Sequence, residues 1–254
     1  VYDIFGLLGA GGTIILPEDK LLKEPSHWIE LIEKHKITVW NTVPMFMQML
    51  VEAAQDPNFR NMGERVGSLR WVLMSGDWIP VDLPQRIRTL FNEVGEKPPE
   101  LVSLGGATEA SIWSIEYRIG EVNPAWKSIP YGKALRNQSF YVLNEELETS
   151  PEWVVGDLYI GGIGLARGYW RDEEKTNEKF IRHERLGRLY RTGDLGRYLP
   201  DGNIEFLGRI DDQVKVRGYR IELGEIESVI SQYPDVTQCV VVAREEGNSK
   251  HLVG

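Results

Sequence analysis

Between residues 26 and 106, helix-like and strand-like segments alternate, and this alternation limits the fold more than any other feature of the chain. Three apolar runs that end near proline or glycine are typical of strands: ITVWNTVP (37–44), SLRWVLMSGD (68–77) and ELVSLGG (100–106). Three stretches have helical periodicity: 26–36, 45–56 and 83–94. A helix at 2–10 and a short strand at 13–17 are expected before them. This order predicts an α/β fold, a parallel sheet with flanking helices.

The pattern changes at about residue 111 and again at about residue 210. In the middle region, short alternating strands are separated by glycine, proline and Asn-Glu turns, which predicts a distorted β-barrel or an open antiparallel unit. In the last region, one helical stretch and one apolar strand indicate the start of a small α+β unit. The expected boundaries are 1–209 for the large part (a sheet at about 1–110, a barrel-like unit at about 111–209) and 210–254 for the small part.

Composition excludes several classes of partner. The 254 residues carry a net charge of −9, which argues against nucleic acid or an anionic membrane as the main partner. No run approaches the ~20 apolar residues that a membrane-spanning helix needs. Cys239 is the single cysteine, so these residues form no internal disulfide, and a reducing compartment suits them. We expect a cytoplasmic protein.

Two strand ends carry residues suited to an anionic ligand. Ligands of parallel sheets bind at the carboxyl ends of the strands, where this chain has SGD (75–77) and GGATE (105–109). Glycines there let the backbone approach a ligand closely. Thr108 offers a hydroxyl to a phosphate oxygen, and Glu109 offers the hard oxygen that Mg²⁺ prefers. A turn with a solvated glutamate explains the second segment equally well.

Charged residues gather again between residues 189 and 227. Asp194 follows a Thr-Gly turn, where a carboxylate can accept both hydroxyls of a ribose. Arg209 and Asp211 flank the expected boundary of the small part. The glycine-rich segment GDLYIGGIGLARGYW (156–170), taken alone, is typical of a tight hairpin with bulges.

Four segments, in this order and spacing, resemble the adenylation domains of nonribosomal peptide synthetases: GGATE, GDLYIGGIGLARGYW, YRTGDL and GRIDDQVKVRGYRIELGEIE. These domains belong to the adenylate-forming ligases, which include acyl-CoA synthetases and luciferases. The resemblance spans essentially the whole chain. It implies the two-part fold of that superfamily, ATP and Mg²⁺ as cofactors, and a carrier protein with phosphopantetheine as partner.

The resemblance also assigns roles to residues. Glu109 would bind Mg²⁺, Asp194 and Arg209 would lie at the ribose, and Asp211 would be the hinge of the mobile small part. Residues assigned to catalysis are Thr108, Glu109, Asp194 and Arg209. Residues assigned to ATP binding are Gly76, Gly105, Gly106, Ala107, Thr108, Asp194 and Arg209. The family usually has an aromatic residue and a proline where this chain has Gly105 and Ala107, which implies a more open, backbone-lined site.

By the same resemblance, the family's phosphate loop precedes residue 1 and its catalytic lysine follows residue 254. We therefore expect a central fragment that does not turn over alone. Some members carry an inserted tailoring domain, such as a methyltransferase, at the position that follows this chain. The hypothesis is that the complete protein carrying this chain, called the parent protein below, has an interrupted adenylation domain.

Seven residues match the positions at which the family recognises its amino acid: Tyr2, Asn41, Leu73, Ser75, Leu104, Ile112 and Trp113. They describe a small, mostly apolar pocket without charge, which suits a thiol. The set also resembles the pattern of cysteine-activating, thiazoline-forming modules. Serine is the closest competitor, and each residue taken alone is equally typical of a buried core.

The leading hypothesis is activation of L-cysteine by ATP to cysteinyl-AMP and pyrophosphate, followed by transfer to the phosphopantetheine thiol of a peptidyl carrier protein. Neighbouring condensation or cyclisation domains would be further partners, in siderophore or other natural-product biosynthesis. Two alternatives remain open. One is an acyl- or aryl-CoA ligase, and the other is a non-catalytic scaffold for a tailoring domain.

Overall fold

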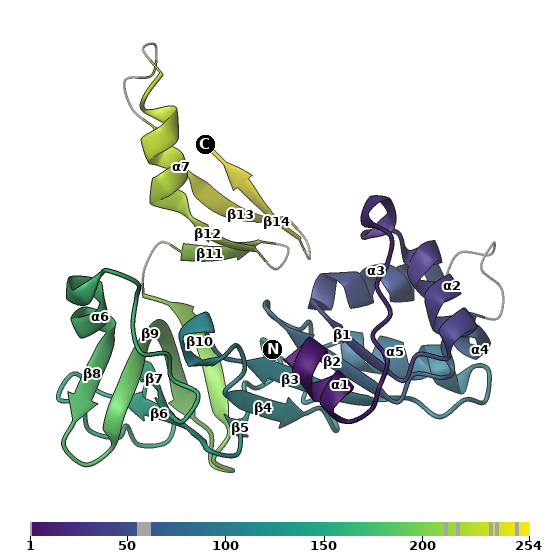
Figure 1. Ribbon diagram of the computed structural model, residues 1–254, viewed down its shortest axis with the longest axis horizontal. Helices are drawn as coiled ribbons and strands as arrows, with labels where there is room; N and C mark the ends of the chain where they lie inside the picture. Colours follow the sequence, from purple (N-terminus) through teal and green to yellow (C-terminus); the bar gives the residue numbers. More distant parts are fainter. Residues whose placement is uncertain are drawn as a thin grey trace.

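The computed structural model describes residues 2–54, 62–210, 213–216, 219–233, 236, 239–246 and 249–254. Figure 1 shows three parts that follow one another along the chain. The first is a sheet with helices, the second is a largely antiparallel sheet, and the third is a small part built from helix α7 and two hairpins.

The first sheet has the order β1-β2-β3-β4-β5, in which β1, β2 and β3 are parallel and β4 is antiparallel to β3. Its strands are β1 (Val39–Thr42), β2 (Trp71–Ser75), β3 (Glu100–Gly105), β4 (Ile115–Arg118) and β5 (Lys133–Ala134). The predicted α/β fold is confirmed. The sheet continues to Ala134, beyond the expected residue 110, because the chain turns back after β3 and pairs with it without an intervening helix.

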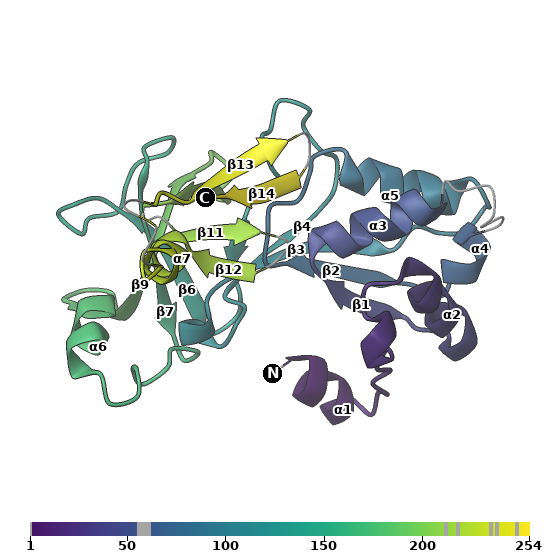
Figure 2. The same cartoon turned by 90° about the horizontal axis from the view of Figure 1, so that it is seen from above.

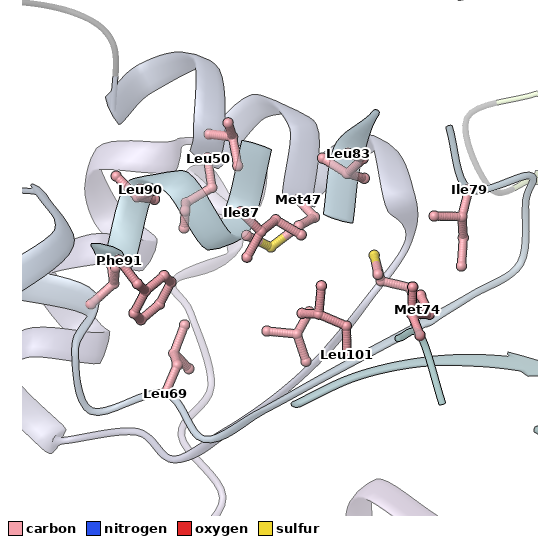
Figure 3. Close-up of a cluster of buried hydrophobic side chains, with 14 of the residues drawn as sticks. Met47, Leu50, Leu69, Met74, Ile79, Leu83, Ile87, Leu90, Phe91 and Leu101 are labelled. Carbon is pink, nitrogen blue, oxygen red and sulfur yellow. The ribbon is translucent and has the colours of Figure 1, made fainter. Parts of the chain in front are cut away.

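Helices α2 to α5 cover one face of this sheet. Their bounds are α2 (Pro25–His35), α3 (Pro44–Ala54), α4 (Met62–Val66) and α5 (Leu83–Asn92). The buried residues of α5 recur every three or four positions, which turns one apolar stripe toward the sheet. Figure 3 shows Ile87 of α5 and Met47 of α3 beside Leu101 of β3 and Met74 of β2, all in one buried cluster. Burying each such side chain contributes about 1.5–3 kcal/mol.

The other face of the sheet carries a separate cluster. Because side chains alternate along a strand, Leu73 of β2 points away from the helices, as do Val102 and Leu104 of β3. Trp113, which follows β3, completes this cluster. The face is therefore apolar but lies outside the main helical core, which is a suitable place for a ligand pocket.

The N-terminal residues run along this second face. The expected helix at 2–10 is confirmed as a π-helical turn η1 (Tyr2–Gly6) followed by α1 (Leu7–Gly9). The strand expected at 13–17 is wrong, since these residues are irregular and pair with no described strand. A β-prone sequence forms a strand only where a neighbouring strand accepts its hydrogen bonds. A short 3₁₀ helix, η2 (Asp19–Leu21), follows.

The second sheet has the order β10-β9-β7-β6, with β8 also paired to β9. Its elements are β6 (Gln138–Leu143), β7 (Gly156–Gly162), α6 (Glu173–Lys179), β8 (Phe180–His183), β9 (Gly187–Tyr198) and β10 (Ile204–Arg209). Its core contains Phe140, Leu158 and Tyr190, together with Ile115 of the first sheet. The two sheets therefore share packing, and the antiparallel unit predicted for this region is present.

The third part contains β11 (Gln213–Val216), β12 (Tyr219–Glu222), α7 (Leu223–Ile230), β13 (Val242–Glu246) and β14 (Ser249–Val253). One antiparallel hairpin precedes the helix and another follows it, where the sequence pattern predicted one helix and one strand (Figures 1 and 2). Asp211, assigned to the hinge, lies outside the described residues. Among the described residues, no helix has the length and apolar character needed to cross a membrane.

Candidate functional site

The loop between β3 and β4, residues 106–114, folds on itself at the carboxyl end of β3. The Ser114 amide donates to the Gly105 carbonyl at 2.8 Å, and the Ile112 amide donates to the Ala107 carbonyl at 3.0 Å. Gly106 has φ +146, and a Cβ there would lie 2.6 Å from the Ile112 carbonyl oxygen. Only glycine fits this position, so GGATE encodes the loop geometry directly.

Ile112 stores backbone strain in this loop. Its φ is +75, a value that is a genuine outlier for a β-branched residue and costs about 1–3 kcal/mol. Its side chain is 44% exposed, although it is large and apolar. Ser111, with φ +63, shares the left-handed conformation. Strained backbone with an exposed apolar side chain is typical of a ligand-binding segment.

Glu109 is held from the second sheet. The Tyr169 hydroxyl donates to Glu109 Oε1 at 2.7 Å, and the Tyr190 hydroxyl hydrogen-bonds to the same carboxyl group. Burial raises the pKa of the Tyr190 hydroxyl, and the charge on Glu109 raises it further, so this hydroxyl keeps its proton. The Ala166 amide also donates to the Glu109 carbonyl at 2.7 Å. The alternative of a solvated glutamate in a turn is therefore wrong.

The residues around Glu109 suit Mg²⁺ only when a ligand supplies further oxygens. Within the described parts of the chain, no three His, Cys, Asp or Glu side chains come together as a metal site. Mg²⁺ in nucleotide sites is commonly held by one or two carboxylates plus phosphate oxygens. A single fixed carboxylate such as Glu109 fits that arrangement. The neighbouring residue Thr108 is exposed to solvent.

Asp194 and Arg209 form a buried ion pair. They are directly opposite each other on β9 and β10, and Arg209 Nη1 lies 2.7 Å from Asp194 Oδ1. Their side chains are only 10% and 11% exposed. Arg209 also donates to the Thr192 carbonyl at 3.2 Å, and the Thr192 hydroxyl accepts from the Asp194 amide at 3.0 Å. The pair therefore presents a rigid carboxylate at the edge of the second sheet.

The site is not open at Gly105, contrary to expectation. A Cβ at Gly105 would lie within 2.7 Å of three ring carbons of Tyr131, so the tyrosine ring occupies the space beside the glycine. The Tyr131 hydroxyl accepts a hydrogen bond from the Gly106 amide. The aromatic group missing from the GGATE segment is thus replaced in space by one from another segment.

The pocket residues gather on the open face of the first sheet. Leu73, Leu104 and Trp113 pack together, and the Tyr2 ring lies 5.2 Å from the Trp113 ring. Ser75 ends β2 beside Leu104, with which it is in register. Gly76 follows with φ +90 and is exposed, so the backbone is accessible there.

Two polar atoms of the predicted pocket residues are buried and have no hydrogen-bond partner among the described residues: Asn41 Oδ1 and Trp113 Nε1. Asn41 Nδ2 donates to Asp3 Oδ1 at 2.7 Å, which fixes the amide and leaves its oxygen as the available acceptor. The Trp113 indole N–H is a donor only. A buried polar group without a partner is costly unless a ligand satisfies it. A ligand bound at these residues would meet one acceptor, Asn41 Oδ1, and one donor, Trp113 Nε1.

Most of the predicted site residues lie in two groups. One is the strand-end group of the first sheet, with the 105–113 loop and the pocket residues, and the other is the Asp194–Arg209 pair. Tyr131 connects them, since its hydroxyl bonds to Gly106 and its pKa is raised by burial and then by the charge of Asp194. The sequence motifs did not point to Tyr131, Tyr169 or Tyr190. The aromatic residue directly before a glycine in IPYGK (129–133) was the available signal for the first.

Comparison with known proteins agrees with this geometry. Residues 1–170 match the family described as AMP-binding enzyme, and the chain belongs to that family. Its fold is that of the adenylation domains of nonribosomal peptide synthetases, as the solved structures below show.

Three relatives define the likeness. The chain is 48% identical over 252 residues to pyochelin synthetase PchF of Pseudomonas aeruginosa (strain UCBPP-PA14), covering 99% of this chain and 13% of PchF. The nonribosomal peptide synthetase FmoA3, with α-methyl-L-serine-AMP bound, matches at 40% identity and TM-score 0.75, covering 89% of this chain and 24% of FmoA3. Holo-PA1221, a protein with adenylation and carrier domains bound to a vinylsulfonamide inhibitor, matches at 28% identity and TM-score 0.86. The match covers 99% of this chain and 42% of PA1221. The chain therefore spans less than half of the length of each of these three proteins.

Proposed function

We propose that the parent protein activates L-cysteine with ATP, forming cysteinyl-AMP and pyrophosphate, and then loads the cysteinyl group as a thioester onto a carrier protein. The observation that carries this proposal is the loop after β3, where Glu109 and the pocket residue Trp113 stand four residues apart. This short loop thus supplies one residue for the phosphates of ATP and one for the side chain of the amino acid. FmoA3, which has also been solved with AMPPNP, supports ATP as the nucleotide.

The chemistry requires positioning and charge stabilisation. The cysteine carboxylate attacks the α-phosphate, pyrophosphate leaves, and a mixed anhydride results. Asp194 is placed to accept the ribose hydroxyls, because Arg209 holds its carboxylate and the Thr192 hydroxyl accepts from its backbone amide. Glu109 would hold Mg²⁺, which supplies neutralising charge to the phosphates when bound. Holding both reactants in one geometry removes much of the entropic part of the barrier.

The pocket supports cysteine as the amino acid. A thiol is small and apolar, yet it offers a weak S–H donor and a weak sulfur acceptor. These two functions match the Asn41 acceptor and the Trp113 donor. Serine has the same shape, and the α-methyl-L-serine adenylate bound to FmoA3 makes serine the second candidate. Cysteine is the less polar of the two amino acids, and the apolar side chains of Leu73, Leu104 and Ile112 therefore favour it over serine.

The substrate is tested by ATP–pyrophosphate exchange in the parent protein with L-cysteine, L-serine, and representative fatty and aryl acids. We expect the fastest exchange with L-cysteine, followed by L-serine at about one tenth of the rate or less, since a single polar group gives modest discrimination. Faster exchange with serine reverses the assignment of the amino acid. Exchange with fatty or aryl acids alone supports a CoA ligase, and no exchange supports a scaffold.

The role of the indole N–H is tested by Trp113→Phe, which keeps an aromatic ring and removes the donor. We expect the KM for L-cysteine to rise about three- to tenfold, the value of one hydrogen bond, with the KM for ATP unchanged. Trp71→Phe is the matched control, because Trp71 packs against the same cluster at the start of β2. An unchanged KM for cysteine in Trp113→Phe would show that this N–H does not contact the substrate.

A further inference from the structure

Tyr131 lies at the junction of the two groups of site residues and has no role in the chemistry described so far. It precedes β5 on a segment that sequence analysis did not connect with the site. Its backbone amide donates to the Ile204 carbonyl at 2.8 Å, which ties this segment to the start of β10. Tyr131 as a whole is half-buried, although burial raises the pKa of its hydroxyl, which lies inside. Part of this residue is therefore accessible, while its backbone is fixed to β10.

The position of the ring is fixed from several sides. Its centroid lies 5.7 Å from the Phe140 ring and 5.4 Å from the Phe206 ring. Gly132, the next residue, has φ +105, and a Cβ there would overlap the Glu116 carbonyl, so only glycine fits directly after Tyr131. The hydroxyl accepts from the Gly106 amide. The ring is thus held against the Gly105–Gly106 peptide from a distant segment.

The surroundings of the ring suit the purine base of a nucleotide. On one side are the bare peptides of Gly105 and Gly106, and on another are the charges of Asp194 and Arg209, which act on the Tyr131 hydroxyl. If Asp194 holds the ribose, the base of the same nucleotide lies next to the Tyr131 ring, where it can stack on it. Bases stack on aromatic side chains without needing a specific edge.

The geometry points to Tyr131 as a positioning residue of the nucleotide site, whose ring takes the space that a side chain at Gly105 would fill and presents an aromatic surface to the base of ATP. The hydroxyl of the same residue holds the Gly106 amide and hence the start of the Glu109 loop. This inference rests on the proposed binding of ATP.

The first test is Tyr131→Leu in the parent protein, with binding of AMPPNP measured by calorimetry and exchange kinetics measured in parallel. We expect AMPPNP affinity to fall about tenfold and the KM for ATP to rise by a similar factor, because one base–aromatic stack is lost. The KM for L-cysteine should stay the same. Phe140→Leu is the matched control, since it removes a buried ring beside Tyr131 but away from Gly105. It should change thermal stability without changing AMPPNP affinity.

The second test uses the overlap between the Tyr131 ring and any side chain at position 105. In Gly105→Tyr, the new ring would collide with the Tyr131 ring, and we expect AMPPNP binding to be lost. The double variant Gly105→Tyr/Tyr131→Gly removes the overlap and should recover affinity to within about tenfold of the wild type, which is the size of a single stacking contact. A single variant that binds normally, or a double variant no better than the single one, overturns the inference.

The outcomes separate this inference from the proposed function. A wild-type parent protein that binds no AMPPNP overturns both. A wild type that binds AMPPNP and a folded Tyr131→Leu variant that binds it equally well overturn the role of Tyr131 alone. A variant in which the affinities for AMPPNP and L-cysteine fall together indicates a general structural role and also overturns the inference.

Discussion

Glu109→Gln in the parent protein is expected to lower cysteine-dependent ATP–pyrophosphate exchange by about a hundredfold or more. The substitution keeps the size of the side chain and an oxygen that accepts from Tyr169, but it removes the charge that Mg²⁺ requires. Loss of a residue that merely supports a metal ligand already costs about 10–100-fold, so loss of Glu109, the proposed ligand, should cost at least the upper value. Exchange should be measured across a range of Mg²⁺ concentrations.

Two variants separate a metal role from a structural one. Glu100→Gln changes an exposed carboxylate at the opposite end of β3 and should leave exchange unchanged. Tyr169→Phe removes the 2.7 Å hydrogen bond to Glu109 but leaves its charge, and a loss of about three- to tenfold is expected. If Glu109→Gln exchanges normally while both Glu109→Gln and Tyr169→Phe lower the thermal stability, Glu109 is a link between the two sheets and not a metal ligand.

Asp194→Ala is expected to destabilise the parent protein by about 3–5 kcal/mol and to abolish AMPPNP binding. The substitution leaves the Arg209 guanidinium buried without its carboxylate, and removal of one partner from a buried pair has a cost of this size. Denaturant unfolding measures the stability. AMPPNP binding, measured at a temperature where the variant is still folded, reports the loss of the ribose contact.

An ion pair between β9 and its other neighbour in the sheet, β7, supplies the control. Asp157 of β7 and Arg191 of β9 form an ion pair at 2.6 Å, but the arginine side chain is 46% exposed. Asp157→Ala should therefore cost less than about 1 kcal/mol, since solvent screens an exposed pair. Equal losses of unfolding free energy in the two variants would show that burial does not make the Asp194–Arg209 pair more important for stability than an exposed pair. In the double variant Asp194→Leu/Arg209→Met, most of the stability should return while AMPPNP binding stays lost.

Local sequence patterns predicted the first sheet well, because each strand and helix there is encoded within a few neighbouring residues. The parallel strands β1, β2 and β3 appear where apolar runs end in turn residues. The pattern failed for α6, whose sequence EEKTNEK has no apolar stripe. This helix depends instead on its N-cap, where the Asp172 side chain accepts from the Lys175 amide at 2.9 Å. It also failed for residues 13–17, where the β-prone sequence has no partner strand.

The sequence by itself determined the α/β fold, the order of the motifs, and the residues of the loop after β3, including the requirement for glycine at position 106. Only the tertiary structure decided what surrounds that loop. Tyr131, Tyr169 and Tyr190 come from segments between 20 and 90 residues away, and they reach Gly105 and Glu109 through the packing of one sheet on the other. Spacing along a chain specifies local geometry, but contacts between distant segments depend on how whole sheets pack, and no short pattern records that.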